Sequence, residues 1–524
     1  MFALFCTIFT QTVQSIMMNR LYLMASAFFF FACKPAESLS KTTNGAIEPE
    51  RMDSRVSGVV IPSASEKINA RDFGFLPSAN AATNTKALQR ISTYINEKKG
   101  DVVLIINKGA YTVGAETFAG AEGKGYSYRG ESLLKIEGCT KPVVIEGNGA
   151  TIKLASGLHF GSFNNRTGAA HNAPAGGFYD YNYVAYPGNM IDVSNNASIV
   201  VRNLTLDGNL QQQKLGGYWG DTGIQLPADG IFGKDNGELI VENVTSRYFL
   251  RDGIHIGNTT PNEKAAVKRI FLLNSTFDGN TRQGFSWIGG NHLVATNCKF
   301  INTGKTVNAQ TKKPVISAPS AGVDMEAELG LIRNGVFTNC TIDNNGGAGF
   351  LSVGDVGNIR YEGGKIIGAT NWSIYGTGPK AVFEKVTIVG SPVNLRIGTG
   401  PNDADNARFN SCLITLDSTL SPTKKVYGNY VMDFGGGAGG HFINCTFESK
   451  GRGTVYGGSG CVFTNCTFKQ EDTAPGYNGY PFMSGTFYGT NRLYRPGPGG
   501  MLPNLDKSKF YGPFYVNDVK VADK

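Results

Sequence analysis

The tetrapeptide Asn444-Cys445-Thr446-Phe447 recurs 21 residues later as Asn465-Cys466-Thr467-Phe468. Related phrases run through the chain, several of them 21 to 26 residues apart, each with a small residue or cysteine followed two places on by an apolar residue. This spacing is typical of one coil of a parallel β-solenoid with loops of variable length. We expect the leading asparagine at a bend, where side-chain amides of stacked coils can bond one another. The other copies begin at Asn203, Asn243, Asn274, Asn297, Asn339, Gly363, Lys385 and Ser411.

A second strand phrase, Gly-apolar-x-apolar, comes before most of these copies. Examples begin at Gly253 and Gly322. Two strand types in constant order per coil predict an all-β helix of parallel sheets. An amphipathic segment at residues 84–98 predicts a helix that caps the open end of the apolar core.

The composition agrees with a large, turn-rich β protein. The chain has 524 residues, of which 41% are hydrophobic and 69 are glycine. That hydrophobic fraction excludes a disordered protein, and the lack of a three-residue glycine period excludes collagen. The net charge of +8 is spread along the chain. No basic cluster with interleaved aromatic residues is present, so a nucleic-acid partner is not expected.

The N-terminus has the layout of a bacterial export signal. Residues 17–20 include Arg20, and an apolar stretch runs from Leu21 to Ala32. Because Cys33 follows directly, the segment resembles a lipoprotein signal in which that cysteine is lipidated, although simple cleavage and release is the alternative. Met18 is a plausible true start. We therefore expect an exported protein, either secreted or periplasmic or held at the outer membrane or cell surface, that contacts a membrane only through a lipid anchor.

The cysteine count does not favour a disulfide framework. Two of the nine cysteines lie in the signal region, which leaves an odd number, seven, for the folded part. No CxxC pair is present, so a structural zinc site is not expected either.

The coils from about Asn69 to Gln470 resemble the right-handed parallel β-helix proteins of the pectate-lyase-like superfamily. That superfamily includes polysaccharide lyases, polygalacturonase-type hydrolases, sugar epimerases and phage tailspikes. The resemblance implies a right-handed single-stranded β-helix that acts on carbohydrate, but this fold hosts several chemistries. Residues 251–254, Arg-Asp-Gly-Ile, resemble the first acidic motif of polygalacturonases. Where that family carries two adjacent aspartates, this chain has Arg282-Gln283.

The candidate catalytic residues lie on the second strand type. Stacking these strands in register predicts an outward column of His255, Ser286 and Asp324, with Arg396 several coils later. Glu326 shares the outward face with Asp324. A like-charged pair gains nothing for folding but raises the proton affinity of one member, as a general acid requires. Asp252, two coils away, is the third candidate, and both retaining and inverting hydrolysis remain open.

The candidate substrate-binding residues surround these acids. Arg282 and His255 suit a sugar carboxylate or sulfate, and His255 could also act as a base. Gln283 lies beside them. Trp219, with Asp221 in the same long segment, is a candidate for stacking on a sugar ring.

The domain prediction has four parts: residues 1–33 as the signal region, 34–57 as a flexible tether, 58–470 as the β-helix, and 471–524 as a segment that caps the end or covers the groove. The predicted function is an exported polysaccharide-degrading glycoside hydrolase. A polysaccharide lyase and a non-catalytic glycan-binding β-helix are the alternatives. No cofactor is expected for a hydrolase, whereas a lyase would make calcium possible.

Overall fold

The computed structural model describes residues 66–116, 128–171, 183–217, 219, 225–396, 403–433, 440–450, 453–456, 460–471, 485–496 and 509–523. All of them belong to one compact unit, Ile61–Lys524. The predicted signal region, the tether and Cys33 lie outside the described residues. Within these residues, no helix combines the length and apolarity that crossing a membrane requires.

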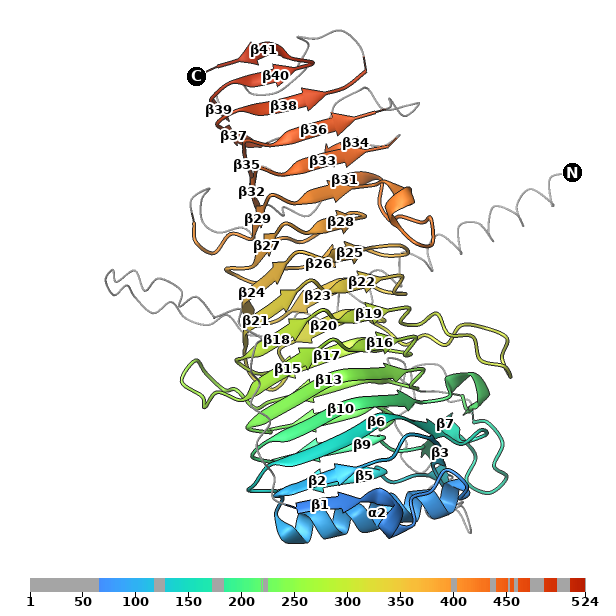
Figure 1. Cartoon of the computed structure of the whole chain (residues 1–524). Coiled ribbons are helices and arrows are strands. Elements are labelled where there is room, and N and C mark those ends of the chain that lie inside the picture. Colours follow the sequence, from blue (N-terminus) through green and yellow to red (C-terminus); the bar gives the residue numbers. More distant parts are fainter. Residues whose placement is uncertain are drawn as a thin grey trace, which may run out of the picture. The chain divides into compact units, whose positions relative to one another are not determined.

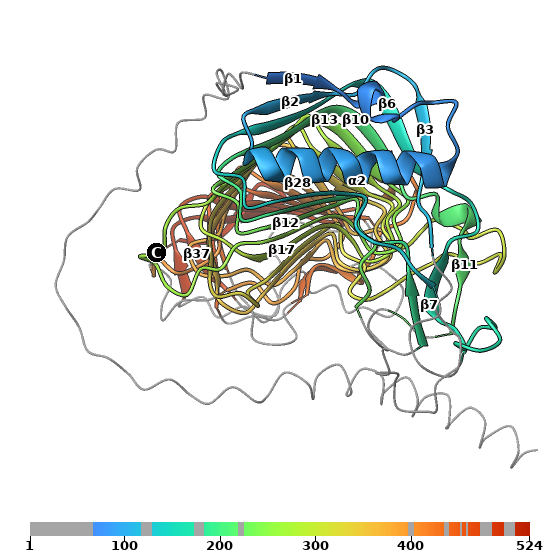
Figure 2. The same ribbon diagram turned by 90° about the horizontal axis from the view of Figure 1, so that it is seen from below.

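The predicted cap helix is present as α2, Ala81–Lys98. The side chain of Asn80 accepts a hydrogen bond from the amide of Thr83 at 2.9 Å and so starts the helix. Its buried face includes Leu88, Ile91 and Ile95, as the spacing predicts. The helix lies across the first coils of the solenoid (Figure 2) and closes the apolar core at that end. A short strand β1, Glu66–Asn69, and a 3-10 helix η1, Ala70–Phe73, precede it.

The remaining strands stack as rungs around one core (Figure 1). One face is an eight-stranded parallel sheet, which we call the site sheet. Its strands in spatial order are β5 (Leu134–Glu137), β9 (Ile191–Ser194), β12 (Ile231–Lys234), β14 (Asp252–Gly257), β17 (Gln283–Gly289), β20 (Val323–Glu326), β23 (Phe350–Val353) and β26 (Ile374–Tyr375).

Two further columns of strands belong to one larger sheet that bends at a short turn. Three long strands pass through both columns: β6 (Val143–Leu154), β10 (Ile199–Asp207) and β13 (Glu238–Arg247). The first column also contains β2 (Val102–Ile105), β15 (Arg269–Leu273), β18 (Leu293–Thr296), β21 (Ile332–Thr338), β24 (Val356–Glu362), β27 (Val382–Glu384), β29 (Arg408–Asn410), β32 (Gly440–Ile443), β35 (Cys461–Thr464), β37 (Thr486–Tyr488) and β39 (Phe510–Tyr511). The second contains β3 (Ala110–Val113), β16 (Thr276–Asp278), β19 (Lys299–Ile301), β22 (Thr341–Asp343), β25 (Lys365–Ile367), β28 (Thr387–Val389), β30 (Leu413–Thr415), β33 (Thr446–Ser449), β36 (Thr467–Gln470), β38 (Asn491–Tyr494) and β40 (Phe514–Val516).

Smaller elements decorate the solenoid. They are β4 (Tyr128–Arg129), β7 (His159–Ser162), β8 (Val184–Tyr186), β11 (Lys214–Leu215), the pair β31 (Tyr430–Asp433) and β34 (Gly453–Tyr456), and the 3-10 helices η4 (Leu210–Gln212) and η6 (Ser418–Leu420).

The repeated asparagine forms the turn between the two columns, as predicted. Asn243 has φ +52° and Asn274 has φ +49°, a left-handed conformation that asparagine tolerates better than most residues. The amides also bond between coils: Asn243 Nδ2 donates to Asn203 Oδ1 at 3.2 Å, and Asn297 Nδ2 donates to Asn274 Oδ1 at 3.1 Å. The asparagine phrase therefore sets both the bend and the contact between successive coils.

The cysteine of the same phrase points into the core. Cys298 and Cys340 are fully buried, and the Cys298 thiol donates to the Leu272 carbonyl at 3.2 Å. All seven described cysteines are free thiols. Phenylalanines stack beside them in the later coils, as in Phe383 and Phe409, whose ring centroids are 4.7 Å apart.

The coils continue beyond residue 470, so the predicted end of the β-helix at that residue is wrong for the described part of 471–524. Strands β37 to β40 pair in parallel with β35 and β36 and with one another. Phe487 and Phe510 supply the inward apolar positions, with their ring centroids 4.9 Å apart. The final strand, β41 (Val519–Ala522), turns back and pairs antiparallel to β40.

Candidate active site

The glycine of the second strand phrase allows neighbouring coils to approach on the site sheet. A side chain at Gly253 would meet the Gly284 carbonyl oxygen at 2.8 Å, and one at Gly284 would meet the Gly322 oxygen at 2.6 Å. The residue just before each glycine therefore occupies the same place in successive coils. Asp252 and Gln283 take these places as the first residues of β14 and β17, and Asp229 takes the same place two residues before β12.

The predicted strand register is correct. His255 pairs with Ser286, and Ser286 pairs with Asp324. Val323 and Met325, which flank Asp324, are in the core. The Asp324 side chain therefore leaves the strand on the opposite face from the core.

The outward face predicted for these acids does not expose Asp324 or Asp252 to solvent. Asp324 is 1% exposed and Asp252 is fully buried, while Glu326 is partly exposed. Alternation along a strand predicts which face a side chain takes, but it does not show what lies over that face. Here polar side chains from neighbouring coils lie beside the acids and bond them.

Arg282 binds Asp252 rather than standing free for a ligand. Its Nε and Nη2 donate to the two carboxylate oxygens of Asp252 at 2.9 and 2.7 Å. Burial works to lower the pKa of Arg282, but Asp252 outweighs it and the pKa is raised. Two buried opposite charges with this forked geometry hold each other in place.

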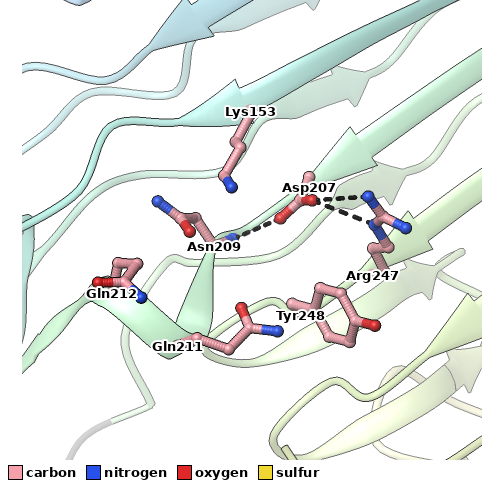
Figure 3. A pocket seen from close by; sticks show the side chains of 7 residues that line it. All are labelled: Lys153, Asp207, Asn209, Gln211, Gln212, Arg247 and Tyr248. Atoms are coloured by element: carbon pink, nitrogen blue, oxygen red, sulfur yellow. Dashed lines mark hydrogen bonds and ion pairs between the residues drawn. The ribbon is translucent and has the colours of Figure 1, made fainter. Parts of the chain in front are cut away.

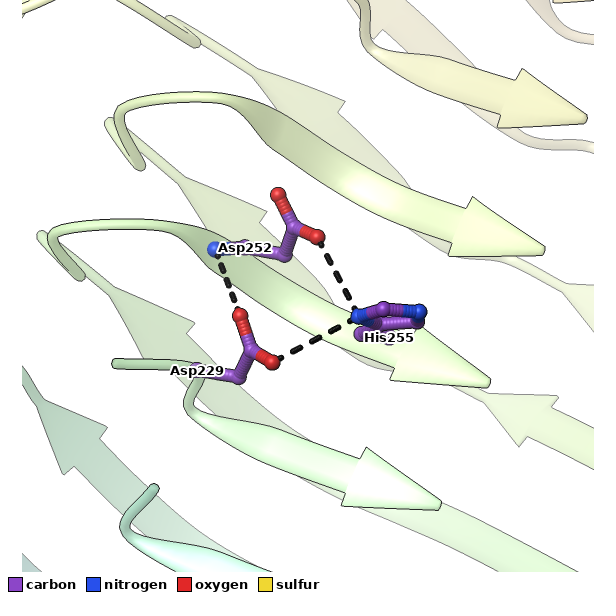
Figure 4. Close-up of side chains that lie close together, drawn as sticks. All are labelled: Asp229, Asp252 and His255. Carbon is purple, nitrogen blue, oxygen red and sulfur yellow. Dashed lines mark hydrogen bonds and ion pairs between the residues drawn. The ribbon is translucent and has the colours of Figure 1, made fainter. Parts of the chain in front are cut away.

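Asp229 is a site residue that the sequence reasoning missed. Its Oδ1 accepts a hydrogen bond from the Asp252 amide at 3.1 Å (Figure 4). Its Oδ2 lies 3.2 Å from Arg251 Nη1. Burial would raise the pKa of Asp229, but Arg251, His255 and Arg282 outweigh burial and hold the pKa below its ordinary value. The signal that could have found it is its position before Gly230, equivalent to Asp252 before Gly253.

His255 faces both carboxylates. Its Nδ1 lies 3.5 Å from Asp229 Oδ2 and 3.7 Å from Asp252 Oδ2 (Figure 4). The ring is 5% exposed and packs edge-on against Phe232. Neither ring nitrogen has a well-formed hydrogen bond within the described part of the chain.

The cluster of Asp229, Asp252 and His255 brings three potential metal-ligand atoms within 4.8 Å of one another. Calcium prefers six to eight oxygen ligands. This cluster offers only two carboxylates and a nitrogen, and each carboxylate is already paired with an arginine. The donor set therefore does not fit a calcium ion.

Asp324 and Glu326 form a pair of acids on β20 with raised proton affinity. Burial and then the charge of Glu326 raise the pKa of Asp324 well above its ordinary value. Burial and the charge of Glu328 raise the pKa of Glu326. The Gln283 amide is held by its Oε1, which accepts from the Ala321 amide at 3.0 Å, so its Nε2 donates to Asp324 Oδ2.

The remaining candidates lie apart from this cluster. Arg396 is exposed and outside the outward column, because Val393 takes that position by bridging to Tyr375. Trp219 packs against an apolar cluster outside the solenoid core, with its ring centroid 5.7 Å from that of Phe160. Asp221 lies outside the described residues.

The comparisons with known proteins agree with the fold. Residues 189–388 match the family model described as right handed beta helix region. The described structure is accordingly a right-handed parallel β-helix. No curated protein matches the chain.

Several solved structures are similar at low identity. The mannuronan C-5 epimerase AlgE4 A-module of Azotobacter vinelandii is 16% identical over 81% of this chain and 93% of its own, with a TM-score of 0.38. The Agl-KA catalytic domain is 13% identical over 86% and 68%, with a TM-score of 0.37. The GH87 α-1,3-glucanase of Streptomyces thermodiastaticus is 13% identical over 84% and 69%, with a TM-score of 0.30. Likenesses at this level do not bear on the reaction.

Proposed function

We propose that this protein is a carbohydrate-active enzyme that cleaves glycosidic bonds in a polysaccharide by hydrolysis, with Glu326 as the proton donor. The observation that carries the proposal is the opposite displacement of carboxyl pKa values along one sheet: Asp324 and Glu326 lie on β20, and Asp229 lies just before β12, three strands away. The pKa is raised at Glu326 and Asp324 and lowered at Asp229. Acid catalysis at a glycosidic oxygen needs a carboxyl group that keeps its proton near neutral pH, beside acids that stay ionised.

The geometry divides the roles among the acids. Glu326 is the partly exposed member of the pair, so it is the group that a substrate can reach. Asp324 lies buried beside it, and the amide of Gln283 fixes its orientation. Asp252 is held by Arg282 and acts as a positioning residue. Its negative charge raises the pKa of Glu326, while Arg282 works in the opposite direction.

A lyase is the second candidate, because of His255. Elimination needs a base that removes a proton from the sugar ring, and a buried imidazole without a well-formed hydrogen bond can serve as one. The N-terminal sequence supports export of either enzyme, with Cys33 as the lipidated residue of an anchored form.

The test is an incubation with a panel of acidic and neutral polysaccharides. New reducing ends without ultraviolet absorbance of an unsaturated product support hydrolysis, whereas added absorbance indicates elimination. Binding without either product would leave a glycan-binding protein and overturn the proposal.

Two variants test the role of Glu326. Glu326→Gln should lower kcat by ~10²-fold or more, the scale of losing a positioned acid. Glu328→Gln is the matched control. Its kcat at the pH optimum should equal that of the wild type, but the alkaline limb of its pH–activity profile should shift to lower pH. The reason is that the charge of Glu328 raises the pKa of Glu326. An unchanged alkaline limb, or full turnover in Glu326→Gln, would place the proton donor elsewhere.

A further inference from the structure

A polar pocket of about 440 Å³ lies away from the site sheet, beside the second column of strands. Figure 3 shows its lining side chains, which come from β6, β10, β13 and η4, together with Asn209 just before η4 and Tyr248 just after β13. The volume falls within the ~300–1,000 Å³ usual for small-molecule sites. The lining residues are Lys153, Asp207, Asn209, Gln211, Gln212, Arg247 and Tyr248.

The charged side chains that line this pocket carry a net positive charge, from Lys153 and Arg247 against Asp207. Lys153, Asp207 and Arg247 are register partners on three successive strands. Arg247 pairs with Asp207 through Nη2 at 3.0 Å and Nε at 3.1 Å, which neutralises that carboxylate. Lys153 is exposed, and no described carboxylate forms an ion pair with it. The pocket therefore presents one free ammonium group.

The walls of the pocket are held by hydrogen bonds that leave ligand-binding groups available. Asn308 Nδ2 donates to the carbonyls of Leu210 and Gln213 at 2.9 and 2.8 Å and so pins η4. The side-chain amides of Gln211 and Gln212, carried by η4, make no hydrogen bond to other described residues. Because the backbone of η4 is fixed and these two side-chain amides are free, the pocket is pre-organised for binding hydroxyl groups.

Tyr248 adds an aromatic surface. Its ring lies beside Gly279, where a side chain would meet the ring at 2.8 Å, and the Arg247 guanidinium lies 5.2 Å from the ring centroid. An aromatic ring, free amides and one unpaired cation together match a sugar that carries a carboxylate. We propose that this pocket is a second glycan-binding site that takes a uronic acid residue of an acidic polysaccharide, outside the catalytic site.

Binding can be tested without turnover. The full chain carrying Glu326→Gln is titrated calorimetrically with a hexamer of a uronic acid and with a neutral glucose hexamer. In this background we expect Lys153→Glu to weaken one class of sites for the acidic hexamer by ~10-fold or more, the scale of losing a hydrogen bond to a charged group. Lys153→Arg should keep the affinity, and so should Lys299→Glu, a matched exposed lysine on β19 of the same column.

The outcomes separate the alternatives. Unchanged affinity in Lys153→Glu, or equal binding of the neutral hexamer, would overturn the proposal. Equal competition by inorganic sulfate at matched ionic strength would also overturn it, because it would reveal a simple anion site. The result does not depend on catalysis, so failure of the proposed hydrolase activity leaves this test intact.

Discussion

Holding Asp324 in its buried place should cost stability at neutral pH. The folded protein keeps a proton on this carboxyl group because its pKa is raised well above the ordinary value of 3.8, whereas the unfolded chain releases it near that value. Between the two pKa values, unfolding releases one proton. The free energy of unfolding therefore falls by ~1.4 kcal/mol for each pH unit that the pH rises.

Asp324→Asn removes this dependence. Asparagine keeps the shape of the side chain, and its oxygen can accept the hydrogen bond from Gln283 Nε2. Above about pH 4, the free energy of unfolding of the variant should rise relative to that of the wild type by ~1.4 kcal/mol per pH unit. This gain should stop at the pKa of Asp324 in the folded protein. Activity should fall at the same time, because the acid pair has lost a member.

Urea denaturation followed by circular dichroism, at about pH 5 and about pH 6, measures the effect as the difference between wild type and variant. Because the two acids titrate as a pair, the double variant with Glu326→Gln gives the full contribution. Glu137→Gln on β5 is the matched control, since that side chain is 48% exposed and should leave the slope unchanged. Parallel pH profiles for wild type and Asp324→Asn would refute the reasoning.

Two further predictions concern stability. Arg282→Met leaves the buried Asp252 carboxylate without its main partner and should lower the free energy of unfolding by ~3–5 kcal/mol. Arg333→Met is the control: because the partners of Arg333 are largely exposed, it should lower the free energy of unfolding by under ~1 kcal/mol. Equal losses for the two variants in urea denaturation would contradict the stabilising role of the buried pair of Arg282 and Asp252. Asn243→Ala should cost ~1–2 kcal/mol because alanine disfavours the left-handed turn. Asn243→Gly should cost less, and an equal loss for both would show that backbone conformation is not the cause.

Much of the fold was predictable because it rests on local rules that repeat. The turn needs a residue that tolerates positive φ, and Asn243 and Asn274 meet that need in the same place of each coil. Strand alternation then fixes the inward face, so the core positions of Val323 and Met325 followed from sequence alone. The helix α2 followed from its periodicity.

The site was less predictable because its properties depend on contacts between coils. The pairing of Arg282 with Asp252 and the burial of Asp324 arise between segments about thirty residues or more apart. The predicted column of outward side chains is correct for His255, Ser286 and Asp324, which lie on paired strands. It is wrong at Arg396, which lies beyond the last strand of the site sheet. Asp229 was visible in the glycine phrase, yet a single aspartate before glycine is also an ordinary turn residue.

The reversed direction of β41 bears on self-association. A stack of parallel strands exposes an edge that a further parallel strand, including one from another copy, can join. Strand β41 runs antiparallel to β40, so it does not offer the direction that the stack propagates. Lys520 of this strand forms an ion pair with Asp523, which follows the strand directly, and charge on an edge strand discourages pairing. This strand therefore covers the edge of β40 with a strand whose direction and charge disfavour the addition of a further parallel strand at the end of the second column.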